Sequence, residues 1–219
     1  RIQNALHLPN NQITSIYNGY SRHFYPISDI SSVTRKYVKE DEYLFFLGNT
    51  DPKKNVPRTL KAYSLYLKKS DKKRPLLIAD LKEDKLDSIL KEQGIEDIKP
   101  YLYYPGYIPN KDLAYLYNGA YVFLYTSLRE SFGIPILEAM ACGTPVITGN
   151  TSAMPEIAGE KGLLADPFNE EDISNKLLLL ENDHLYYTQQ VEYGLQRVKK
   201  FSWESTALSL LEIYQNILK

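Results

Sequence analysis

Two glutamates eight positions apart, Glu130 and Glu138, are the residues of this chain best suited to chemistry. Between them lie Gly133, which lets a backbone approach a ligand closely, and Pro135, which suits the first turn of a helix. A helix N-terminus offers unpaired N–H groups and the positive end of a dipole, which suit a phosphate. The carboxylates would repel a phosphate and suit hydroxyl groups instead. The combination indicates a ligand that carries phosphates, a ribose and a sugar, as a nucleotide sugar does.

The segments around this motif alternate between strand-like and helix-like patterns. We expect helices near 135–142, 56–69, 82–93 (closed by Gly94), 111–118, 170–182, 184–199 and 204–218, and strands at 12–17, 43–47, 75–79, 98–103, 121–125, 145–148 and 163–165. Asn55 is a plausible N-cap of the helix at 56–69. The alternation predicts an α/β fold, a Rossmann-like doubly wound parallel sheet flanked by helices, as a single domain over residues 1–219. In such sheets ligands bind at the carboxyl ends of the strands.

The motif and its neighbours resemble the retaining glycosyltransferases of family 4 (glycosyl transferases group 1). The resemblance covers nearly the whole chain and rests on the Glu-x7-Glu motif at 130–138, the run that follows it to Ile147, and the segments 16–19, 47–55, 104–109 and 201–203. It implies the C-terminal, donor-binding half of a GT-B enzyme, which consists of two Rossmann-like domains across a cleft. Only about forty residues precede the first core strand, so we expect the N-terminal acceptor domain to be absent from this chain.

The resemblance also implies roles for the two glutamates. Glu138 matches a residue that accepts hydrogen bonds from the ribose hydroxyls, and Glu130 matches one that contacts the transferred sugar. Since the family is generally described as reacting by front-face displacement, we assign Glu130 to positioning and electrostatic stabilisation, with nucleophilic attack as the minority alternative. Glu130, which faces the sugar, and Lys54, which faces the donor diphosphate, are the expected catalytic residues.

The loop that follows the strand at 43–47 carries the cations of the expected site. Lys54 matches a basic residue that binds the donor diphosphate, and Lys53 adds a second charge. Asn49 stands where the family commonly has an arginine, so neutralisation of the donor depends more on Lys54. The backbone of residues 131–134 should contact the diphosphate and sugar, and the loop at 107–108 should receive the base. The expected substrate-binding residues are Asn49, Lys53, Tyr107, Ile108, Ser131, Phe132, Gly133, Ile134 and Glu138.

Composition narrows the function class. The hydrophobic content of 43% and charged content of 24% are those of an ordinary globular domain, and a net charge of −1 does not indicate a nucleic-acid partner. The basic run at 68–74 fits a solvated helix end or, less well, a membrane surface. The single cysteine, Cys142, fits a small buried residue in a reducing compartment, and the histidines lack ligand-spaced partners. We expect a cytoplasmic protein, with the inner face of the membrane as an alternative site, and neither metal nor cofactor.

The function expected from the sequence is transfer of a hexose-type sugar from a UDP- or GDP-sugar to an acceptor hydroxyl, for cell-surface polysaccharide or glycoconjugate synthesis. The glycan or lipid-linked acceptor would be bound through the missing domain, so we expect this chain by itself to be inactive. Two alternatives stay open: a non-catalytic nucleotide-sugar-binding module, and a GT-B hydrolase or epimerase acting on a nucleotide sugar.

Overall fold

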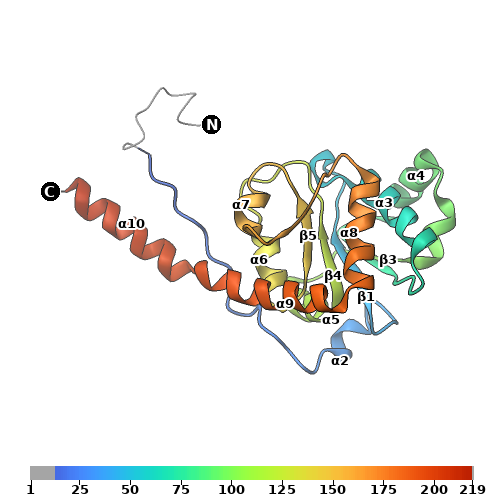
Figure 1. Ribbon diagram of the computed structural model, residues 1–219, viewed down its shortest axis with the longest axis horizontal. Coiled ribbons are helices and arrows are strands. Elements are labelled where there is room, and N and C mark those ends of the chain that lie inside the picture. Colours follow the sequence, from blue (N-terminus) through green and yellow to red (C-terminus); the bar gives the residue numbers. More distant parts are fainter. Residues whose placement is uncertain (1–12, 219) are drawn as a thin grey trace.

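A computed structural model describes residues 13–218 and contains one parallel sheet between two layers of helices (Figure 1). The six strands lie in the order β3-β2-β1-β4-β5-β6, and every neighbouring pair is parallel. The elements are α2 (Ser31–Thr34), β1 (Tyr43–Leu47), η2 (Pro52–Lys54), α3 (Val56–Lys69), β2 (Leu76–Ala79), α4 (Glu83–Gln93), η3 (Glu96–Tyr101), β3 (Leu102–Gly106), α5 (Asn110–Gly119), β4 (Ala120–Tyr125), α6 (Ile134–Ala141), β5 (Val146–Gly149), α7 (Met154–Ala158), β6 (Leu163–Ala165), α8 (Glu170–Asn182), α9 (His184–Arg197), η4 (Val198–Lys200) and α10 (Trp203–Ile217).

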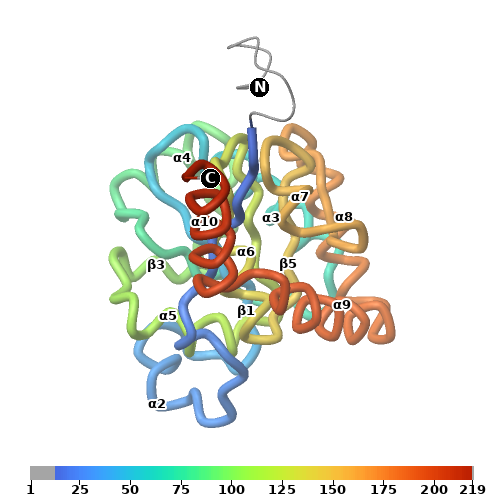
Figure 2. Tube along the Cα trace, turned by 90° about the vertical axis from the view of Figure 1, so that its left-hand side faces the viewer, coloured from blue at the N-terminus to red at the C-terminus, as the bar shows by residue number. Residues whose placement is uncertain are grey.

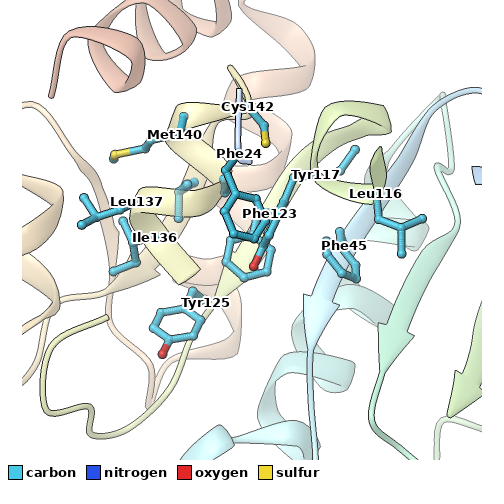
Figure 3. Close-up of a cluster of buried hydrophobic side chains, with 14 of the residues drawn as sticks. Phe24, Phe45, Leu116, Tyr117, Phe123, Tyr125, Ile136, Leu137, Met140 and Cys142 are labelled. Carbon is cyan, nitrogen blue, oxygen red and sulfur yellow. The ribbon is translucent and has the colours of Figure 1, made fainter. Parts of the chain in front are cut away.

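The central strand β1 is apolar along its length because both of its faces are buried. Successive side chains of a strand point to opposite faces. Phe45 therefore joins the core under α5 and α6, and Phe46 joins the core under α3, α4 and α8. Figure 3 shows the first of these cores, where the ring of Tyr117 packs edge-on against Phe45 and Phe123. The expected doubly wound, Rossmann-like parallel sheet is confirmed.

The order of the strands creates a switch point in the sheet. The chain leaves β1, builds β2 and β3 on one side, and then returns to place β4 on the other side of β1. The connection after β1 leads to α3 on one face of the sheet, and the connection after β4 leads to α6 on the other face. Ligands of open α/β sheets bind in the crevice at such a switch point.

Two expected strands are wrong. Residues 13–17 form no strand within the described part of the chain (residue 12 lies outside it), because the segment packs beside α10 and pairs with no strand there. The strand expected at 98–103 begins only at Leu102, since residues 96–101 form the 3-10 helix η3 and Pro100 has no N–H for a sheet ladder. The helix expected near 184–199 is confirmed as α9, which ends at Arg197 and continues as η4 to Lys200. Gly94 closes α4 in a left-handed conformation, as expected of a glycine at a helix end.

The N-terminal segment of the described chain lies beside the start of α10. Thr206 Oγ1 donates to the main-chain oxygen of Tyr17 at 2.6 Å, and the N-terminal segment runs beside the first turns of α10 (Figures 1 and 2). In the described residues α10 buries none of its side chains, and it extends away from the sheet (Figure 1). Cys142 is buried at the end of α6, where burial raises the pKa of its thiol to about 12. It is the small buried residue that the sequence predicts.

Candidate functional site

The loops after β1 and β4 are joined at the switch point through their backbones. The N–H of Leu128, after β4, donates to the main-chain oxygen of Lys53, after β1, at 2.7 Å. Two residues further on, the side chain of Asn55 donates to the main-chain oxygen of Thr126 at 3.0 Å. These two hydrogen bonds fix the relative height of the two loops. The expected cationic loop and the expected glutamate loop therefore form one unit.

Lys54 and Glu130 meet across this crevice. Lys54 Nζ lies 2.8 Å from Glu130 Oε1, and the two side chains are only 17% and 13% exposed. The same ammonium group lies 5.1 Å from the centroid of the Tyr125 ring, which adds a cation–π contact. The two residues expected to be catalytic, which are 76 positions apart in the sequence, thus form a partly buried ion pair.

The main chain of Glu130 is held by a residue that the sequence analysis missed. Ser152 Oγ donates to the main-chain oxygen of Glu130 at 2.6 Å, and the N–H of Glu130 points at the same hydroxyl at 3.3 Å. Beside it, Thr151 Oγ1 donates to the oxygen of Leu128 at 3.0 Å. Both hydroxyl residues directly follow β5 at the carboxyl edge of the sheet. That position was the available signal, since hydroxyl residues commonly bond to nearby backbone in loops.

The loop after β4 ends at the N-terminus of α6. Gly133 precedes the helix with φ 107°, a conformation that favours glycine, and a Cβ atom there would lie 3.0 Å from Ile136 Cδ1. Pro135 occupies the first turn, where it has no N–H to leave unsatisfied. The first N–H groups of a helix have no partner within it, so Gly133 and Ile134 can present donors to an anion at the crevice.

Glu138 lies one turn into α6 and is largely buried. The hydroxyl of Tyr117, from α5, donates to Glu138 Oε2 at 3.3 Å. Burial raises the pKa of Glu138 to about 7, because the charged form is deprived of water, and the Tyr117 hydroxyl opposes that rise. Glu138 can consequently exchange a proton near neutral pH, and any partner that donates hydrogen bonds to it favours the ionised form. The sequence analysis missed the role of Tyr117, because the helical pattern of α5 does not show which residue of another helix Tyr117 meets.

The remaining expected site residues differ in how they are placed. Tyr107, at the end of β3, is 76% exposed, whereas the side chain of Ile108 is buried, so only the backbone of Ile108 can face a base. Phe132 is half-buried, and its ring lies 6.2 Å from those of Tyr17 and Phe201, as in a packing role. Ser131 is exposed on the loop before α6.

Two expected polar residues bond within their own loop. Asn49 Oδ1 accepts from the N–H of Asp51 at 2.9 Å. Lys53 Nζ lies 3.2 Å from Asp51 Oδ2, with both side chains close to half exposed. Exposed ion pairs of this kind contribute little to stability, so the ammonium group of Lys53 is free to turn to a ligand.

A further carboxylate, Asp80, directly follows β2, between the loops after β1 and β3. Its φ of 61° is uncommon for a residue with a side chain, and its N–H donates to the oxygen of Gly106 at 2.8 Å. Burial raises the pKa of Asp80, and the charge of Lys54 opposes that rise. Asp80 therefore belongs to the same electrostatic environment as the Lys54–Glu130 pair.

The hollows of the surface do not coincide with this chemistry. The loop at 49–52 and the facing side of α4 line a hollow of about 400 Å³ next to the site. A larger hollow of about 670 Å³ lies between α7 and α9, around Glu156, Tyr193 and Arg197. We place the site at the switch point because the opposed charges and the helix N-terminus meet there. Among residues 13–218 no group of three or more side chains could hold a metal ion, and no helix of that range is long and apolar enough to cross a membrane.

Comparison with known proteins identifies the class to which this arrangement belongs. The family of glycosyl transferases group 1 matches residues 29–197, which include both loops of the switch point and the whole of α6. The chain belongs to this family, and its fold is that of the C-terminal half of a GT-B glycosyltransferase.

Among curated relatives, the chain is 36% identical over 175 residues to the O-antigen chain mannosyltransferase B of Escherichia coli, which covers 79% of this chain and 45% of that protein. It is 30% identical over 199 residues to the serotype-specific mannosyltransferase WbdA of Escherichia coli, which covers 89% of this chain and 24% of that protein. The chain thus spans less than half the length of these two relatives.

Solved structures agree on the fold. HepE of Anabaena, in a crystal structure with UDP, superposes with a TM-score of 0.80 at 18% identity, over 97% of this chain and 60% of that one. The C-terminal domain of the glycosyl transferase group 1 protein LpcC of Francisella tularensis superposes with a TM-score of 0.65 at 23% identity, over 81% of this chain and 94% of that one.

Proposed function

We propose that this chain is the donor-binding half of a retaining hexosyltransferase that uses a nucleoside diphosphate sugar. The observation that carries the proposal is the Lys54–Glu130 pair at 2.8 Å, which lies at the switch point beside the N-terminus of α6. A cation and a set of free N–H groups suit a diphosphate, and a nearby carboxylate suits the sugar attached to it. An N-terminal domain outside residues 1–219 would bind the acceptor and close the cleft.

In this proposal each residue meets one part of the donor. The ammonium group of Lys54 and the N–H groups at Gly133 and Ile134 bind the diphosphate. The carboxylate of Glu138 accepts hydrogen bonds from the two ribose hydroxyls, one with each oxygen. The base lies against the backbone at residues 107–108, with Tyr107 exposed beside it.

Transfer with retention requires the acceptor oxygen to bond to the anomeric carbon on the face that the phosphate leaves. The bond from the anomeric carbon to the phosphate oxygen breaks, the acceptor hydroxyl forms the new bond, and its proton passes to the leaving phosphate. Positive charge develops on the sugar while the first bond breaks. Glu130 stabilises that charge, and Lys54 stabilises the negative charge on the departing diphosphate. We propose that this chemistry needs no metal ion.

The transferred sugar that fits the relatives is mannose, because both E. coli proteins are named mannosyltransferases and one acts on the O-antigen chain. Synthesis of a cell-surface polysaccharide is the corresponding process, with a glycan or lipid-linked acceptor. The base is uracil or guanine. We place the protein in the cytoplasm or at the inner face of the membrane, where a nucleotide-sugar donor and a lipid-linked acceptor meet.

Calorimetric titration of the full-length protein with UDP, GDP and their sugars, in buffer with EDTA, tests the proposal. Binding of one nucleoside diphosphate in EDTA, followed by transfer to a glycan acceptor, is the expected result. Binding that requires Mg²⁺ or Mn²⁺ would contradict metal independence. Binding without transfer would instead indicate a nucleotide-sugar-binding module, and consumption of the donor without an acceptor would indicate a hydrolase or epimerase.

A further inference from the structure

Asn55 lies between Lys54, the last residue of η2, and the first residue of α3, and its backbone conformation is uncommon. Its φ of 60° and ψ of 32° are left-handed, a region that asparagine enters more readily than most residues. The residue is 2% exposed and directly follows Lys54. Asn55 was expected to cap α3, and this expectation is wrong: within the described residues its side chain accepts no N–H of that helix.

The amide of Asn55 instead bonds to the loops that follow two other strands. Its Nδ2 donates to the main-chain oxygen of Thr126 at 3.0 Å and to that of Pro167 at 2.7 Å. These oxygens belong to the loops that follow β4 and β6, which are 71 and 112 positions away in sequence. An NH2 group has two hydrogens, so the amide satisfies one buried carbonyl with each.

This geometry restricts the residue type at position 55. Glycine would accept the backbone conformation but would leave two buried carbonyls without a donor. Aspartate has nearly the same shape, but its carboxylate would face two carbonyl oxygens with no hydrogen to give. Only asparagine combines tolerance of the left-handed region with a double donor of the required length.

We propose that Asn55 is a positioning residue of the donor site, and that it sets where the ammonium group of Lys54 lies relative to Glu130. Its backbone is bonded directly to that of Lys54, and its amide is tied to Thr126, four residues before Glu130. The second tie, to Pro167, holds the same point against β6. Because its side chain is buried, Asn55 acts through Lys54 rather than by contact with the donor. The inference rests on the proposed role of Lys54 as the diphosphate ligand.

A double-mutant cycle on the full-length protein tests this role. The variants are Asn55→Asp, Asn55→Gly, Lys54→Ala and each double variant, and the measurements are calorimetric affinity for GDP and UDP and unfolding in urea. We expect either change at Asn55 to weaken binding of the nucleoside diphosphate by about 10-fold when Lys54 is present, since small displacements of a ligating group are costly. In the Lys54→Ala background the same change should alter affinity by less than about twofold, because the group being positioned is gone.

A matched control is Tyr43→Phe, since Tyr43 is buried at the start of β1, away from both loops of the site, and its hydroxyl donates to the main-chain oxygen of Leu116 at 2.7 Å. It should lower stability and leave affinity unchanged. Two results would overturn the role: equal losses of affinity at Asn55 with and without Lys54, or lower stability with unaltered affinity. If one Asn55 variant does not fold, the double-mutant cycle with the other Asn55 variant tests the role. Failure of the unsubstituted protein to bind any nucleoside diphosphate would overturn the proposed function itself, which is a different outcome from an additive cycle.

Discussion

Replacement of Glu130 by glutamine should tighten the binding of a bare nucleoside diphosphate while it slows sugar transfer. The carboxylate of Glu130 pairs with the ammonium group of Lys54 at 2.8 Å. A diphosphate brings its own negative charge to the same ammonium group, so the two anions compete. Glutamine has almost the same shape and removes the competing charge.

The exposure of the pair sets the size of the effect. Fully exposed ion pairs contribute about 0.2–1 kcal/mol, and this pair, at 17% and 13% exposure, lies beyond the exposed class without being fully buried. Removing the competing charge of Glu130 should therefore improve the free energy of nucleotide binding by about 1 kcal/mol. This corresponds to an affinity about fivefold higher, since about 1.36 kcal/mol is tenfold. The rate should change in the opposite direction, because a carboxylate that stabilises charge only in the transition state affects the rate rather than the affinity.

Titration calorimetry with GDP and UDP measures the affinity, and a transfer assay on the full-length protein measures the rate. Glu171→Gln is a matched control, because Glu171 pairs with Lys69 at 2.7 Å on the surface, away from the crevice. It should change neither quantity. Unchanged or weaker nucleotide binding in Glu130→Gln would refute the competition, and would mean that Lys54 and Glu130 hold the diphosphate jointly.

Three further results are expected. Lys54→Ala should weaken binding of a nucleoside diphosphate by about 1.5–3 kcal/mol, or about 10- to 150-fold, as measured by calorimetry. Unaltered affinity would show that Lys54 does not bind the diphosphate. Nucleotide affinity should fall as the pH drops below about 7, because Glu138 then takes up a proton and can no longer accept two ribose hydroxyls, and Glu138→Gln should abolish this dependence. Tyr117→Phe removes the hydroxyl that favours the ionised form of Glu138, so the midpoint of the pH profile should move to higher pH; a profile that does not move would contradict the contact.

The pKa of Glu138 also affects stability, and the sign differs from that of a paired carboxylate. Its folded pKa of about 7 is raised above the ordinary value of 4.5, so the folded protein holds the proton more tightly than the unfolded chain. The contribution of Glu138 to the free energy of unfolding is therefore largest below the unfolded pKa and is lost as the pH rises toward 7. A ribose at Glu138 offsets this loss, because it favours the charged form.

The sequence predicted the elements and the loops of the site more reliably than the contacts between them. Apolar runs and helical spacing located β1 and α3, and the positions of Lys54 and Glu130 after strands indicated one edge of the sheet. Their contact depends on β4 lying beside β1, and that order follows from packing of the whole sheet. Ser152 and Tyr117 were missed for the same reason, since each meets its partner only through the fold.

Asn55 illustrates how a local rule gives way to a distant partner. Asparagine before a helix is a good N-cap, and the rule located the correct boundary of α3. The side-chain cap is not formed because the amide is oriented by other partners: Nδ2 donates to the buried carbonyls of Thr126 and Pro167, and Oδ1 accepts from the side chain of Arg58 at 3.3 Å. A buried carbonyl left without a donor is costly, so the distant contacts fix the orientation of the amide.

The same contacts indicate how far the site is organised before a donor arrives. The loops after β1 and β4 are fixed by two hydrogen bonds, Leu128 to Lys53 and Asn55 to Thr126, and Ser152 holds the backbone of Glu130 from a third loop. In the proposed donor site, these backbone ties leave the side-chain ends as the groups still to be ordered. Ordering a long side chain costs about 0.5–1.5 kcal/mol, whereas ordering a loop costs about 1–2 kcal/mol for each residue. A crevice built in this way can separate the Lys54–Glu130 pair at small cost, which leaves most of the diphosphate's binding energy available to orient the sugar.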